Sequence, residues 1–123
     1  MTELEKMIQE LRQKNVQIDR ILPIFLEDEE YYVETLKSFL EENEITQLQQ
    51  CILQKNYEAA MNHAMNVKAL TGTLGLTSAY QSAQSICLSL HRHSYATLDR
   101  EVKQIADCCQ SLCLLLHLSP PSL

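Results

Sequence analysis

The side chains best placed to act together lie between residues 58 and 72, on a segment with helical periodicity. Met65 and Lys68 are three residues apart, and the small residues Ala69 and Gly72 each follow four positions later. A methionine thioether is a weak acceptor with no ionisable proton, so Met65 has no acid, base or nucleophilic chemistry at neutral pH. An exposed, flexible thioether does make a good hydrophobic contact. These residues therefore favour binding over reaction.

Helix geometry places these residues on one side of the segment. At about 100° per residue, with Ala64 at the centre of the buried face, Met65 lies at the edge of the core. Because Ala69 and Gly72 beside it are small, we expect the Met65 side chain to project from the surface of the helix. On spacing alone, a core-edge methionine and a solvated Lys68 are the simpler interpretation. The exposed strip consists of Glu58, Asn62, Met65, Lys68, Ala69 and Gly72. We expect Tyr57, Ala60, Met61, Val67 and Thr71 to point inward.

The same segment resembles the signature of histidine-containing phosphotransfer (HPt) domains. That signature is His-x-x-Lys-Gly, with a further Gly ten positions after the histidine. Lys68, Leu74 and Gly75 fall in register with it, which places Met65 at the acceptor position and Ala69 at the first glycine. Upstream, residues 24–41 are similar to the phenylalanine-acid-tyrosine start of many bacterial members, so the resemblance covers most of the chain.

The resemblance implies an all-α fold, an antiparallel up-and-down four-helix bundle with an additional N-terminal helix. In the family, an imidazole accepts the phosphoryl group and the adjacent lysine offsets its charge. With Met65 at that position, we expect no phosphotransfer and no catalytic residue. The implied partner is a receiver domain of a response regulator or of a hybrid histidine kinase, docked through the strip around Met65.

Two alternatives stay open. His63 is the nearest substitute acceptor, but two helical steps turn it about 200° from Met65, away from Lys68. An active phosphohistidine carrier would use His63. The other alternative is a structural helical bundle with no role in phosphorelay.

Other reactive residue types form weaker patterns. Cys87 with His91, and Cys109 with Cys113, are i, i+4 pairs that could each present two metal ligands. No CxxC or HExxH motif accompanies them, and cysteines on apolar stripes are usually buried thiols, so we expect neither a metal nor a cofactor. Residues 27–30 are four acids that suit a solvated helix start. An ordinary enzyme is not expected.

Composition limits the class of protein. A chain of 123 residues that is 46% hydrophobic suits one domain with a core, and two glycines and three prolines leave few turn formers, so we predict an all-α fold. A net charge of −6 without a basic cluster argues against nucleic-acid partners. The odd number of cysteines, five, and the lack of an apolar leader favour the cytoplasm. The longest apolar run, residues 112–116, is too short to span a membrane.

Local signals predict the elements that position the strip. A first helix, capped by a box of Thr2 and Glu5, reaches about Asn15, and Pro23 breaks a short amphipathic piece after it. One long helix then begins at the acids of residues 27–30 and continues to Ile52, with a candidate kink near Asn43. The predicted domain spans residues 1–118, with an extra N-terminal helix at 1–16 and a tail at 119–123.

The second half of the chain carries three further signals. Asn56 is an N-cap for a helix from Tyr57 to about Leu74, which Gly75 ends in a left-handed conformation. Ser78 and Gln81 suggest a capping box for the next helix, which ends at residues 91–93. The last helix carries apolar residues from Leu98 to Leu116 and stops at residues 119–121. Leu114, Leu115 and Leu118 exceed one buried stripe, so they fold onto the N-terminal helix or form a contact patch.

Overall fold

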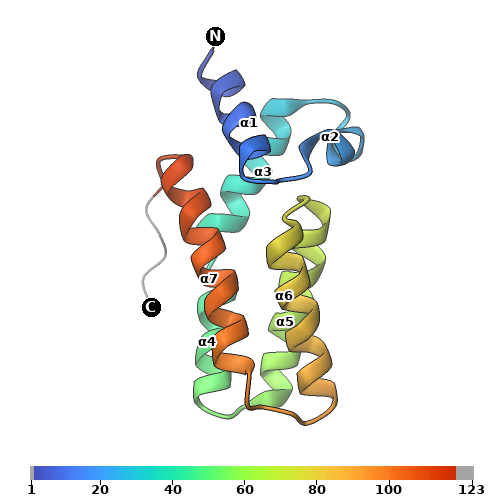
Figure 1. Cartoon of the computed structure of the whole chain (residues 1–123), viewed down its shortest axis with the longest axis vertical. Helices are drawn as coiled ribbons and strands as arrows, with labels where there is room; N and C mark the ends of the chain where they lie inside the picture. The colour runs from blue at the N-terminus through green and yellow to red at the C-terminus, as the bar shows by residue number, and fades with distance from the viewer. Residues whose placement is uncertain (1, 119–123) are drawn as a thin grey trace.

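The computed structural model describes residues 2–118, and within them the chain is all-α, as predicted, with no strand. It forms seven α-helices and one short 3₁₀ helix (Figure 1). They are α1 (Glu3–Gln13), α2 (Ile18–Ile21), η1 (Leu22–Phe25), α3 (Glu29–Glu41), α4 (Glu44–Leu53), α5 (Tyr57–Thr73), α6 (Thr77–His91) and α7 (Leu98–Leu115).

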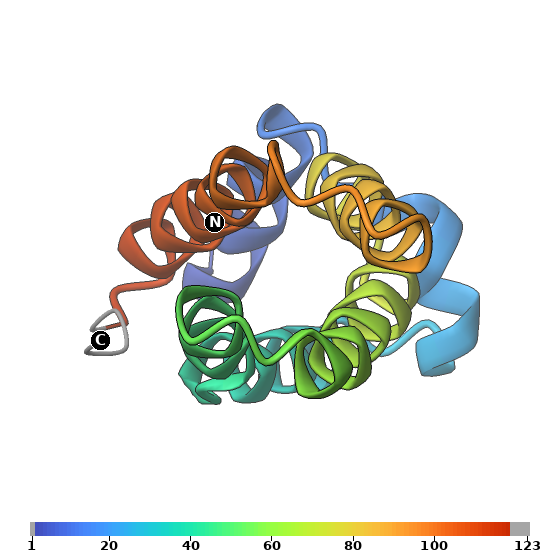
Figure 2. The same cartoon turned by 90° about the horizontal axis from the view of Figure 1, so that it is seen from below.

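The long helices share one hydrophobic core. Helix α4 packs against α5 and α7, and α6 packs against the same two helices, so each has two neighbours (Figure 2). The loops that join these four helices lie alternately at the two ends of the helices (Figure 1). Helices α1, α2, η1 and α3 cover the end at which α5 meets α6 (Figure 1). The largest fully buried side chains include Tyr32, Leu36, Leu48 and Ile105, from three of these helices.

Helix starts follow the predicted caps in part. The Thr2 hydroxyl accepts from the amide of Glu5, at 3.1 Å, and the Asn56 side chain accepts from the amide of Ala59, at 3.3 Å. Asp28, one of the four acids, caps α3 in the same way. The predicted box of Ser78 and Gln81 is wrong. Helix α6 begins at Thr77 with Leu76 as its N-cap and no side-chain cap, because the turn at Gly75 leads directly into it.

The predicted long helix, from the acids at residues 27–30 to Ile52, is two helices, so that prediction is corrected. The chain becomes extended at Glu42, with a ψ angle of 154°, and α4 begins at Glu44. The break lies at the candidate kink near Asn43. Its consequence is a change of neighbours: α3 packs on η1, α1 and α7, whereas α4 packs on α5 and α7. One straight helix cannot follow both sets.

Five helices end in the same way, with a left-handed residue two positions after the last helical one. These residues are Asn15, Lys55, Gly75, His93 and His117. The amide of the next residue donates to a helix carbonyl five residues back, for example Asn56 to Cys51 at 2.8 Å, which is the Schellman pattern. Helix α7 therefore ends at Leu115, earlier than predicted, and the expected stop at residues 119–121 lies outside the described residues.

The turn at Gly75 ties α5 to the start of the chain. The Gly75 φ angle is +74°, and its carbonyl accepts from the amide of Gln17, at 3.0 Å. A Cβ at this position would lie 2.8 Å from Ile21 Cγ1 and 3.1 Å from the Gln17 carbonyl oxygen. The hydroxyl of buried Tyr32 donates to the carbonyl of Leu74, at 2.6 Å. Segments more than forty residues apart thus meet at one turn.

The three leucines at the C-terminal end of the described chain differ in burial. Leu115 and Leu118 are partly buried against the core, and Leu114 is exposed. Among the helices of residues 2–118, none combines the length and apolar composition that a membrane span needs.

Replacing Gly75 with alanine tests how much depends on this turn. Gly75→Ala should lower the free energy of unfolding by about 2 to 4 kcal/mol, because a left-handed alanine is strained and its methyl group meets backbone. Gly72→Ala is the matched control: its Cβ meets only the Tyr80 ring, at 3.2 Å, and the change should stay within about 1 kcal/mol. Urea unfolding of both variants gives the comparison, and equal losses would contradict it.

The reverse test introduces a glycine at a left-handed position that is not glycine. Lys55 has a φ angle of 60° and is exposed. Lys55→Gly should be more stable than Lys55→Ala by about 1 kcal/mol, because glycine adopts this conformation without steric cost. Thermal or urea unfolding of the two variants measures the difference. A more stable alanine variant would mean that the turn imposes no strain.

Candidate functional site

Helix α5 carries the strip, and its opposite face is buried. Ala60, Ala64, Val67 and Thr71 are buried as predicted, while Tyr57 and Met61 are only half-buried. The one polar member, Thr71, donates its hydroxyl to the Val67 carbonyl at 2.7 Å, so it is satisfied within the helix. Small buried residues bring the backbone of α5 close to its neighbours and fix which face turns outward.

Met65 stands on the outward face with 56% of its surface exposed. Glu58, Asn62, Ala69 and Gly72, which share its side of the helix, are exposed as well. Ala69, one turn later, and Gly72, two turns later, are small, and Met65 is the large apolar side chain that α5 exposes. The strip therefore offers an apolar contact framed by polar side chains.

Lys68 differs from the rest of the strip because it is half-buried and leans toward α6. It lines a hollow between α5 and α6 together with Gln84, Cys87, Leu88 and His91. Burial raises the pKa of the Cys87 thiol, and the nearby Lys68 charge partly opposes this shift. Lys68 therefore lies between the exposed strip and α6.

His63 lies on the other flank of α5, against α4. Its Nδ1 is 2.6 Å from Glu44 Oε1, and the Asn66 amide donates to the same oxygen at 3.2 Å. Only 26% of the His63 side chain is exposed. The structure therefore does not bring His63 together with Lys68. The partner Glu44 was not identified from the sequence, where no spacing rule links residues nineteen apart.

The cysteine pairs do not form a reactive centre. Cys109 and Cys113 are buried, and burial raises the pKa of both thiols, in Cys109 with help from the neighbouring thiols. Cys87 is half-buried and His91 is exposed. Across residues 2–118, no three His, Cys, Asp or Glu side chains gather closely enough to hold a metal ion.

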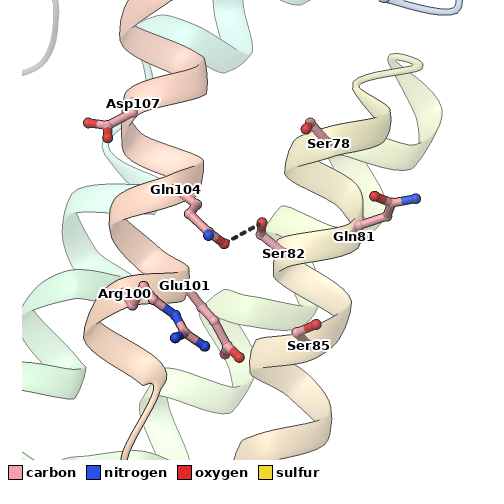
Figure 3. A pocket seen from close by; sticks show the side chains of 8 residues that line it. All are labelled: Ser78, Gln81, Ser82, Ser85, Arg100, Glu101, Gln104 and Asp107. Atoms are coloured by element: carbon pink, nitrogen blue, oxygen red, sulfur yellow. Dashed lines mark hydrogen bonds between the residues drawn. The ribbon is translucent and has the colours of Figure 1, made fainter.

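An open polar groove of about 640 Å³ lies between α6 and α7 (Figure 3). This groove was not predicted from the sequence. Ser82 donates to Gln104 across it at 3.3 Å, and Glu101 points toward α6. One Glu101 oxygen accepts from Thr97 at 3.1 Å, while the other is buried without a partner in the chain. The sequence signal that could have indicated the groove is the spacing of Ser78, Ser82 and Ser85, which places three hydroxyls on one helix face. The residues that line the groove include no histidine.

Comparison of the chain with protein-family models, with curated proteins and with solved structures finds no match.

A double-mutant cycle tests the contact on the α4 flank. His63→Gln and Glu44→Gln should each destabilise the fold, and their coupling energy should be about 1 kcal/mol, because the pair is short and mostly buried. Urea unfolding of the two single variants and the double variant supplies the values. Additive losses would show that the contact contributes no stability and that His63 is free to act elsewhere.

Proposed function

We propose that this chain is an HPt-like module of two-component phosphorelay signalling that binds a receiver domain without carrying phosphate. The receiver would belong to a response regulator or to a hybrid histidine kinase. The observation that carries the proposal is the exposure of Met65 at the position where the resemblance expects the acceptor histidine. In this proposal α4, α5, α6 and α7 are the antiparallel four-helix bundle, and α1 is the additional helix.

The docking surface is the strip of Glu58, Asn62, Met65, Lys68, Ala69 and Gly72. Its centre is an apolar, flexible side chain, and its surroundings are small or polar residues that let another surface approach. Met65 cannot accept a phosphoryl group, because its thioether has no proton to lose and forms no stable adduct with phosphorus at neutral pH. Binding without transfer would sequester the receiver from active phosphodonors. The five free thiols suit a reducing cytoplasm, where such signalling would take place.

The position of His63 supports this proposal over an active carrier. Glu44 holds its Nδ1, the ring faces α4, and Lys68 lies on the opposite flank of α5. A phosphoryl group on His63 would therefore lie on the flank away from Lys68, the cation that the resemblance assigns to offset its charge.

Restoring the acceptor tests the proposal. Receiver domains labelled with radioactive acetyl phosphate are mixed with the wild-type chain, with Met65→His, and with Met65→His combined with Ala69→Gly. We expect no acid-labile label on the wild type and clear label on the double variant, because the exposed position and Lys68 are retained and the Ala69 methyl group is removed.

Met61→His is the matched control, since it places an imidazole one turn earlier on the same helix at a half-buried position, and it should stay unlabelled. Label on the wild type that disappears in His63→Ala would overturn the proposal in favour of an active carrier. A double variant that binds the receiver but takes no label would show that the geometry assigned to the strip is wrong.

A further inference from the structure

Three large apolar side chains between η1 and the first turn of α3 are exposed. Ile24, Leu26 and Tyr31 are exposed at 62%, 83% and 52%. Ile24 and Leu26 flank the buried Phe25, and the Tyr31 ring packs edge-on against Phe25 with centroids 5.2 Å apart. We call this group of Ile24, Leu26 and Tyr31 the apolar corner. In Figure 2 the light-blue segment that contains it projects outward beside α5.

The corner is held in place by its backbone and by Phe25. Leu26 and Glu27 are both left-handed, with φ angles of 59° and 60°, and the Glu27 amide donates to the Leu22 carbonyl at 2.9 Å. Phe25 also packs edge-on against buried Tyr32, with centroids 5.3 Å apart. The fold therefore accepts two strained residues and still leaves Leu26 in water, where burial would be favourable.

The acidic residues next to the apolar corner indicate the charge of the partner that would cover it. Glu27, Asp28 and Glu30 are exposed beside it, and Asp28 already caps α3. A second copy of this chain would bring like charge, because the net charge is −6 and the sequence has no basic cluster. An anionic membrane would be repelled by the same carboxylates. A partner with apolar residues and surrounding lysines or arginines complements both features.

We propose that the apolar corner binds a basic amphipathic helix of another protein. Its apolar face would cover Ile24, Leu26 and Tyr31, and its basic side chains would pair with Glu27 and Glu30. This surface is separate from the strip around Met65, so the inference does not depend on receiver binding and extends the module to a second partner.

The test uses a synthetic 18-residue amphipathic helix of leucine and lysine, titrated into the isotope-labelled chain and followed by amide NMR shifts. The largest shifts should fall between residues 24 and 31. Leu26→Asn should weaken binding by about tenfold, because it removes an apolar side chain. Asparagine tolerates the left-handed conformation at this position, so the backbone should stay in place. Glu27→Gln with Glu30→Gln should weaken it several-fold and flatten its dependence on salt.

Leu53→Ser is the matched control, because Leu53 is 79% exposed on α4 and outside the corner, and its affinity should equal that of the wild type. The same peptide with glutamate in place of lysine should not bind. The proposal is overturned if Leu26→Asn leaves the affinity unchanged, or if Leu53→Ser weakens binding equally. It is also overturned if shifts at the corner come only from self-association or from vesicles of phosphatidylglycerol.

Discussion

The C-terminal turn of α5 is the constraint on which the other features depend. At this turn a left-handed glycine lets the backbone of Gln17 approach, and the Tyr32 hydroxyl satisfies the buried Leu74 carbonyl. Burial raises the pKa of Tyr32 far above its ordinary value, so the phenol keeps its proton and remains a donor at any ordinary pH. An unpaired carbonyl here would cost more than the hydrogen bond adds, which makes the contact hard to replace. It fixes α5 against α2 and α3, and with α5 the face that carries Met65.

The two flanks of α5 are occupied by contacts within the molecule. On one side His63 and Asn66 share a carboxylate oxygen of Glu44, which ties α5 to α4. On the other side Lys68 lies near Cys87, and Gly72 allows the Tyr80 ring to approach. Between these flanks, Met65 and its exposed neighbours make no such contacts, so the surface left for a partner is narrow and well defined. Its residue types can bind but cannot react.

The sequence predicted those features that depend on local chemistry. Asn56 and Thr2 cap helices because their side chains reach amides three residues away, and Gly75 ends α5 because glycine adopts the left-handed conformation without steric cost. The break at Asn43 had a readable signal, since no apolar residue falls at the helical positions between Leu40 and Ile45. The start of α6 did not, because the backbone turn at Gly75 replaces a side-chain cap. The contact of His63 with Glu44 and the polar groove between α6 and α7 depend on how helices meet, which spacing along one helix does not specify.

The most direct measurement is a titration of the isotope-labelled chain with an unlabelled receiver domain, followed by amide NMR shifts. We expect saturable shifts centred on Met65 and extending to Asn62 and Ala69, with Glu44, His63 and Asn66 unmoved. Shifts centred on His63, or no shifts with any receiver that binds an active HPt domain, would contradict it.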